Sequence, residues 1–115
     1  MIYLASPYSH EDPAVQHHRF LVVCRVAARL MRQGHQVFSP IAHSHPIAES
    51  GGLPGDWAFW EAYDYTMMDA CKELWVVIMD GWGASKGVNA EIDYMRATGK
   101  SVRYIMPTAD EVEAA

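Results

Sequence analysis

Short, mostly apolar segments alternate with longer stretches of helical periodicity along this chain. The apolar segments cover residues 2–5, 36–39, 74–79 and 102–106, and a polar residue or a proline follows each of them. Residues 13–33, 57–72 and 88–98 instead place apolar side chains at helical spacing. Continuous apolar strands between helices are typical of parallel sheets covered on both faces. We therefore expect a three-layer, doubly wound α/β domain of Rossmann-like type, with four to five parallel strands.

The strand order 2-1-3-4 is the common one for such a sheet, and it fixes where a ligand binds. Ligands of open α/β sheets lie beyond the carboxyl ends of the strands, where the strand order reverses. That point lies between the first and third strands, so residues 6–10 and 80–87 are the expected site loops. Residues 1–107 are expected to form one domain, and residues 108–115 a frayed acidic tail.

Two local expectations concern the segments between the strands. Residues 41–55 contain Pro46, Pro54 and a glycine pair, which predict a long loop, and long loops are usually functional or mobile. Asp56 is expected to cap the helix that follows. In the first helix, one face is expected to consist of Leu21, Cys24, Ala28 and Met31, with arginines on another face.

Composition and charge exclude several classes of function. The chain has 115 residues, of which half are hydrophobic and a fifth are charged, as in an ordinary globular domain. Its net charge of −5, without any basic run, argues against a nucleic-acid surface. The apolar stretches are far shorter than the ~20 residues of a membrane span. No secretory signal is visible, and Cys24 and Cys71 fit buried thiols, so we expect a cytoplasmic protein.

The segment 80–87, Asp-Gly-Trp-Gly-Ala-Ser-Lys-Gly, joins a predicted buried strand to a helix. Its glycines allow close approach of the backbone to an anion, the helix start directs amides toward it, and Ser85 adds a hydroxyl. The glycine spacing is neither that of a Walker loop nor that of a dinucleotide fingerprint. The alternative is a tight turn with a helix cap.

Two carboxyl groups are candidates for acid–base or nucleophilic chemistry. Glu91 lies roughly 9 Å along the helix axis from Ser85 and borders an apolar stripe, which suits a nucleophile or base. Asp64 shares a stripe with Trp60 and Met68, where desolvation raises its pKa and keeps it protonated as a general acid. The alternatives are a surface glutamate and a packing or capping aspartate. Asp93 is expected to be solvated.

Histidines and aromatic residues suggest a lid and a partner surface. The alternating pair His43 and His45 can chelate zinc, but a third ligand at ordinary spacing is missing, so lining of a lid or plain loop histidines are expected instead. The histidine pair His17-His18 does not supply that third ligand at ordinary spacing either. Aromatic side chains point all around residues 57–65, which indicates that a partner subunit covers one side.

Residues 2–7, Ile-Tyr-Leu-Ala-Ser-Pro, resemble the opening of the nucleoside 2-deoxyribosyltransferases and the related nucleoside 5′-monophosphate N-glycosidases. The turn Ser85-x-Gly87-x-x-x-Glu91 is similar to their phosphate-binding turn and catalytic glutamate, at the spacing of the monophosphate branch, and Asp64 corresponds to their aspartate. The resemblance covers about residues 1–106. This sequence departs from it in Ala5-Ser6-Pro7-Tyr8, which replaces the usual glycine-serine opening, in a small insertion at Glu73-Leu74 and in the histidine loop. It resembles more closely an uncharacterised bacterial and phage domain family that shares Ser-Pro-Tyr-Ser-His and Ser-Pro-Ile-Ala-His-Ser-His-Pro-Ile.

The resemblance implies a flavodoxin-like homodimer with sites near the subunit boundary and with no metal or redox cofactor. The expected reaction is cleavage of the N-glycosidic bond of a nucleotide, with Glu91 as nucleophile, Asp64 as proton donor and Tyr3 orienting Glu91. The further residues expected to bind substrate are Ser85, Gly87, Ser6, Tyr8, Trp60, Asp80, His43 and His45. Hydrolysis and base exchange, the base, and ribose or deoxyribose stay open. The alternative function is a nucleotide-binding or sensing module without turnover.

Overall fold

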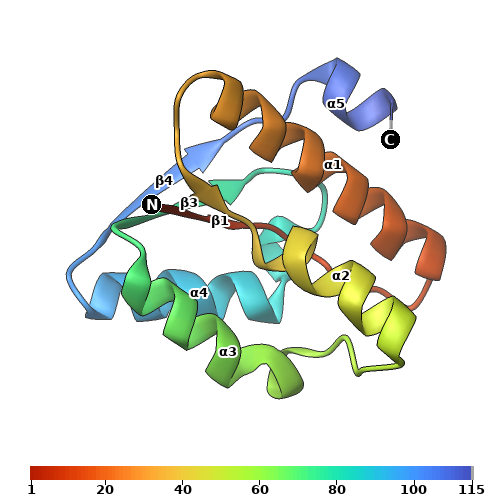
Figure 1. Cartoon of the computed structure of the whole chain (residues 1–115), viewed down its shortest axis with the longest axis horizontal. Helices are drawn as coiled ribbons and strands as arrows, with labels where there is room; N and C mark the ends of the chain where they lie inside the picture. Colours follow the sequence, from red (N-terminus) through yellow and green to blue (C-terminus); the bar gives the residue numbers. More distant parts are fainter. Residues whose placement is uncertain (115) are drawn as a thin grey trace.

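A computed structural model describes residues 1–114 and places one parallel sheet between two layers of helices (Figure 1). The strands are β1 (Ile2–Ala5), β2 (Val37–Phe38), β3 (Glu73–Val77) and β4 (Ser101–Ile105), in the order β2-β1-β3-β4. The helices are α1 (Pro13–Arg32), α2 (Pro40–Gly51), α3 (Trp57–Ala70), α4 (Lys86–Ala97) and α5 (Ala109–Glu113), and the short 3-10 helix η1 (Trp82–Ala84) precedes α4. The predicted three-layer α/β class and strand order are confirmed.

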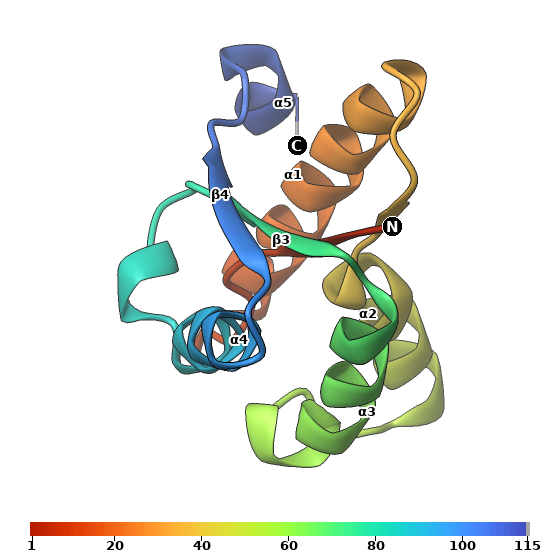
Figure 2. The ribbon, with the colours of Figure 1, turned by 90° about the vertical axis from the view of Figure 1, so that its left-hand side faces the viewer.

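The two faces of the sheet pack against different helices (Figure 2). Side chains alternate between the faces of a strand, so Leu4 of β1 packs with α1, whereas Tyr3 and Ala5 pack with α3 and α4. β1 is buried along its whole length, while β4 forms an edge and is largely exposed. Tyr3 therefore faces the helix that carries Glu91.

The buried face of α1 differs from the prediction. Val22, Val26 and Leu30 are buried against the sheet, whereas Met31 is 52% exposed. Both sets of residues have helical spacing, and the valine-rich set forms the broader apolar stripe, so it packs on the sheet. No helix within residues 1–114, α1 included, is both long and apolar enough to cross a membrane.

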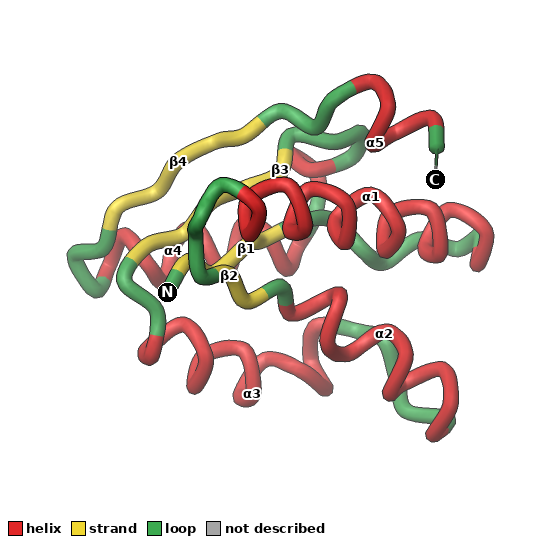
Figure 3. The backbone as a smooth tube through the Cα atoms, turned by 45° about the horizontal axis from the view of Figure 1, so that its top comes forward, coloured by secondary structure: helices red, strands yellow, loops and turns green. Residues whose placement is uncertain are grey.

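The prediction of a loop over residues 41–55 is wrong, because α2 occupies most of that segment (Figure 3). Ser39 caps the helix by accepting a hydrogen bond from the amide of Ala42, and Pro40 begins the first turn, where proline is favoured. Pro46 lies inside the helix, and Gly52 ends it with a φ of 68°. Pro40 at the start of the helix, Pro46 inside it and Gly52 at its C-cap are therefore all compatible with α2.

The acidic tail is also more ordered than expected, up to residue 114. Thr108 and Glu111 form a capping box that begins α5. Glu111 accepts two hydrogen bonds from the Arg29 guanidinium, at 2.8 and 3.1 Å, which fix α5 against α1. The predicted tail extends to residue 115, which lies outside the described residues.

Candidate functional site

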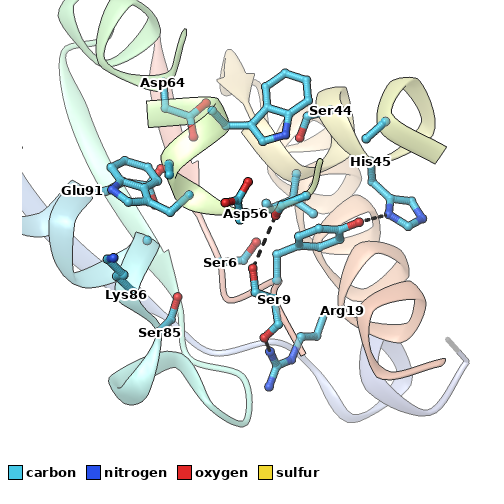
Figure 4. Close-up of a pocket in the computed structure, with 18 of the residues that line it drawn as sticks. Ser6, Ser9, Arg19, Ser44, His45, Asp56, Asp64, Ser85, Lys86 and Glu91 are labelled. Carbon is cyan, nitrogen blue, oxygen red and sulfur yellow. Dashed lines mark hydrogen bonds between the residues drawn. The ribbon is translucent and has the colours of Figure 1, made fainter. Parts of the chain in front are cut away.

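A pocket of about 460 Å³ lies between the loops that follow β1 and β3 and the helices α2, α3 and α4. Both loops predicted from the strand order contribute to it. Its lining includes Ser6, Tyr8, Arg19, His45, Asp56, Trp57, Trp60, Asp64, Ser85, Lys86, Gly87 and Glu91. Figure 4 shows acidic, basic and hydroxyl side chains around the same space.

Glu91 brings a buried carboxyl group to this pocket from the second turn of α4. It is only 4% exposed, because its neighbours Val88, Ile92 and Met95 pack against the sheet. The hydroxyl group of Tyr3, which is fully buried beneath the pocket lining, donates a hydrogen bond to Glu91 Oε2. Burial raises the pKa of Glu91 to about 8; Asp64 adds to the rise, and the Tyr3 hydrogen bond opposes it. Asp93, as expected, is exposed.

Asp64 brings a second buried carboxyl group to the pocket, from α3. Burial raises its pKa to about 7, against an opposing contribution from the Tyr3 hydroxyl. The predicted desolvation of Asp64 is confirmed. Asp64 and Glu91 both interact with Tyr3, and their charges repel each other. Interacting carboxyl groups titrate as a pair, so the protonation of Asp64 and that of Glu91 are coupled near neutral pH.

The N-terminus of α4 lies at the same pocket. Ser85 is the N-cap residue, and its Oγ accepts a hydrogen bond from the amide of Val88 at 3.2 Å. The capping alternative is therefore realised, yet the hydroxyl proton of Ser85 stays available to an anion. The pocket also contains Lys86 and Gly87, and the positive end of the helix dipole favours negative charge there.

Arg19 is a pocket residue that the sequence analysis missed. Its guanidinium donates hydrogen bonds to the carbonyl oxygens of Ser9, at 3.0 Å, and Asp80, at 3.5 Å. Arg19 thus ties the loop after β1 to the loop after β3 and adds positive charge to the pocket. Gly81 has a φ of +87°, a backbone conformation that favours glycine, and a Cβ atom there would lie 2.5 Å from the flexible end of the Arg19 side chain, which would have to shift. Arg19 lies in a helix with several arginines, and no spacing distinguished it.

Ser6 lies at the end of β1, and its Oγ is buried without a hydrogen-bond partner among the described residues. A buried polar group without a partner costs about 1–3 kcal/mol. Since Ser6 also lines the pocket, a ligand atom is the natural partner for its hydroxyl. Tyr8 and Trp60, two further predicted residues, contribute aromatic surface to the pocket.

Two of the residues predicted to bind substrate do not line the pocket. Asp80 is exposed, and it contributes only its carbonyl oxygen to the contact with Arg19. His43 stacks on Tyr63 and shares a hydrogen bond with that hydroxyl at 2.9 Å. Residues two apart lie on different sides of a helix, so α2 separates His43 from His45. Asp56, predicted as a cap, precedes α3 but makes no capping hydrogen bond.

His45 instead meets two residues that were not predicted with it. His17 of α1, His45 and Glu49 place one ligand atom each within 4.8 Å of one another. Within residues 1–114, this is the group of histidine, cysteine and acidic side chains that can hold a metal ion.

Comparison with known protein families identifies the family to which this chain belongs. The family described as a domain of unknown function (DUF1937) matches residues 1–106. No curated protein matches the chain. The match includes all four strands and every residue that lines the pocket. The chain therefore belongs to the DUF1937 family.

Proposed function

We propose that this protein cleaves the N-glycosidic bond of a nucleoside or deoxynucleoside 5′-monophosphate. The observation that carries this proposal is a pair of buried carboxyl groups, Glu91 and Asp64, in the same pocket as the N-terminus of α4. The resemblance of the turn from Ser85 to Glu91 to that of the monophosphate N-glycosidases supports it.

In the proposed reaction, an oxygen of Glu91 attacks the anomeric carbon of the sugar while the bond from that carbon to the base breaks. The reactive form of the coupled pair is the one that carries its single proton on Asp64 and leaves Glu91 ionised, and Asp64 gives that proton to the departing base. The product is a covalent ester between the sugar phosphate and Glu91, as in retaining glycosidases. Water, activated by the Asp64 carboxylate, then cleaves the ester and restores both groups; capture by a second base gives exchange instead.

The remaining pocket residues supply recognition. Ser85, Lys86 and the amides around Gly87 bind the 5′-phosphate, because a helix N-terminus and an ammonium group both favour an anion. Tyr8 and Trp60 offer aromatic surface to the base. The unpartnered Ser6 hydroxyl binds a polar atom of the nucleotide.

A homodimer belongs to the same proposal. Phe59 and Tyr63 of α3 are 47% and 43% exposed, and Ile47 and Leu53 nearby in the chain are similarly exposed. A second copy of the chain would cover this apolar surface. Light scattering during size-exclusion chromatography measures the mass directly, and Phe59→Ser is expected to weaken the dimer.

The test is incubation of the protein with a panel of nucleoside 5′-monophosphates and matching free nucleosides, followed by chromatography for released base. We expect base release from at least one monophosphate, with free nucleosides reacting at least a hundredfold more slowly. A second free base in the mixture distinguishes exchange from hydrolysis. Tight binding of nucleotides that are recovered intact would instead identify a sensor and contradict the proposal.

A further inference from the structure

Three side chains from two helices meet at the rim of the pocket, away from the carboxyl pair. His45 and Glu49 are one turn apart on α2, and His45 Nε2 lies 3.1 Å from a carboxylate oxygen of Glu49. The imidazole ring of His17, on α1, lies 5.7 Å from that of His45. The ligand atoms of all three residues lie within 4.8 Å of one another.

The ring of His45 is held in place on its other side. It is 6% exposed and packs on Phe20, with the ring centres 4.4 Å apart. Its Nδ1 shares a hydrogen bond of 2.5 Å with the hydroxyl group of Tyr8, which is the dashed line at His45 in Figure 4. When Nδ1–H donates to the Tyr8 oxygen, the lone pair of Nε2 is free on the side of Glu49. Metal-bound histidines are oriented by such a second hydrogen bond.

We propose that His17, His45 and Glu49 bind a divalent transition-metal ion of the zinc type. Two imidazoles and a carboxylate are a common set of zinc ligands. Adjacent ligand atoms around tetrahedral zinc lie about 3.3 Å apart, given bonds of ~2.0–2.1 Å. The distance from His45 Nε2 to Glu49 Oε2 is 3.1 Å, which is close to that value. The side chains of His17 and Glu49 are exposed and free to close the remaining distance.

Three protein ligands leave a fourth position of the ion open, as in zinc sites that bind a water or a ligand. His45 also lines the pocket, so this open position borders the space in which a ligand binds. The ion would link α1 to α2 at the pocket rim and offer a positive charge to an oxygen ligand. This site stands apart from the proposed function, because Glu91, Asp64 and Ser85 take no part in it.

The test uses the purified protein, freed of metal with a chelator and returned to chelator-free buffer. Titration calorimetry with zinc chloride is expected to give one ion per chain, and cobalt(II) is expected to give the visible absorption bands of a four-coordinate site. Magnesium, which prefers an octahedral set of oxygen ligands, is expected to give no binding. Glu49→Gln and His17→Ala are each expected to weaken zinc binding at least tenfold.

Matched variants separate this site from adventitious binding. His10→Ala and Glu11→Gln change exposed residues of the same types in the loop before α1, and they are expected to leave zinc affinity unchanged. Tyr8→Phe keeps the ring and removes the hydroxyl, with an expected tenfold to hundredfold weakening. All variants are checked for folding by thermal melting without metal. No zinc uptake by the unmodified protein, equal uptake of magnesium, or an affinity unchanged in Glu49→Gln and His17→Ala would overturn the proposal.

Discussion

Tyr3 of the central strand β1 donates a hydrogen bond to the carboxyl group of Glu91 in α4, although 88 positions of sequence separate them. Both residues are buried. Burial, and then the nearby charges of Glu91 and Asp64, hold the pKa of Tyr3 far above its ordinary value, so its hydroxyl keeps its proton. The sheet therefore provides Glu91 with a fixed donor that orients the carboxyl group toward the pocket.

Replacement of Glu91 by alanine or glutamine is expected to abolish base release and to leave nucleotide binding intact. Loss of the nucleophile removes the covalent route, and comparable removals in proteases cost about 10⁶ in rate. Base release is measured by chromatography and binding by calorimetry. Asp93→Ala, on the exposed side of the same helix, is the control and is expected to behave like the unmodified protein. Near-normal turnover by Glu91→Gln would contradict the assignment.

Tyr3→Phe is expected to shift the acid limb of the pH profile of kcat/KM to higher pH. In the proposed reaction Glu91 attacks only when ionised, so the acid limb follows the first proton lost from the coupled pair of Glu91 and Asp64. Removing the Tyr3 hydrogen bond raises the pKa of Glu91 further, whereas Asp64→Asn removes a repulsion and moves the acid limb to lower pH. Rates of base release from about pH 5 to 10 measure both shifts. Tyr65→Phe, which changes a tyrosine outside the pocket, is the control. If the pH profile of Tyr3→Phe coincides with that of Tyr65→Phe, Tyr3 does not position Glu91.

Ser85→Ala is expected to reduce the preference for nucleotide over nucleoside about tenfold, since it removes one hydrogen bond to the phosphate. The same change also removes the cap of α4, which costs about 1 kcal/mol of stability. Ser39→Ala removes the equivalent cap of α2 without touching the pocket, so it controls for the loss of stability. Equal rates with nucleoside and nucleotide, unaffected by Ser85→Ala, would show that the turn is purely structural.

The stability of the protein is expected to fall as the pH rises from about 5 to 8. In that range the folded protein keeps the proton of Glu91, whose pKa is raised from 4.5 to about 8, while the unfolded chain has lost it. The stabilising contribution of protonated Glu91 is complete below pH 4.5, is lost as the pH rises through about 8, and is on the order of 5 kcal/mol. Asp64 acts in the same direction. Urea unfolding at several pH values measures the free energy of unfolding, which should depend less steeply on pH in Glu91→Gln than in the unmodified protein. The same dependence on pH in both proteins would mean that Glu91 is ionised in the folded state.

Glu111→Gln is expected to destabilise the docking of α5 by about 1 kcal/mol near neutral pH. Burial alone raises the pKa of Glu111, but the hydrogen bonds from Arg29 and Thr108 outweigh it and hold the pKa below its ordinary value. This contribution is present above pH 4.5 and is lost as the pH falls through the lowered value. Thermal melting at two pH values measures it. Glu113→Gln, on the exposed side of α5, should have no effect, and equal melting of the two variants would exclude a role for the ion pair.

Local patterns correctly predicted the four strands and the helices α1, α3 and α4, but not α2, α5 or the cap of α3. The apolar strands and helical stretches predicted the sheet and its order, because alternating strands and helices favour few topologies. The spacing from Ser85 to Glu91 predicted that both lie in the first turns of the same helix. The apolar neighbours of Asp64 predicted the desolvation of its carboxyl group. Helical spacing alone did not select the buried face of α1, since two overlapping stripes both satisfy it. Only packing on the sheet decided between them.

Contacts between distant segments depended on the tertiary structure. Pro46 and the glycine pair favour a loop locally, yet the cap at Ser39 and the packing of α2 on α1 and β1 stabilise a helix there. That helix moves His43 out of the pocket and aligns His45 with Glu49, while α1 brings His17 to them. The sequence by itself determined the strands, the helices α1, α3 and α4, and the places of Glu91 and Asp64 on two of these helices, because these depend on neighbours within a few positions. The partner of Tyr3 was expected only from the family resemblance, and the partners of Arg19 and His45 were decided by packing, since each of these contacts joins segments that only the folded sheet brings together.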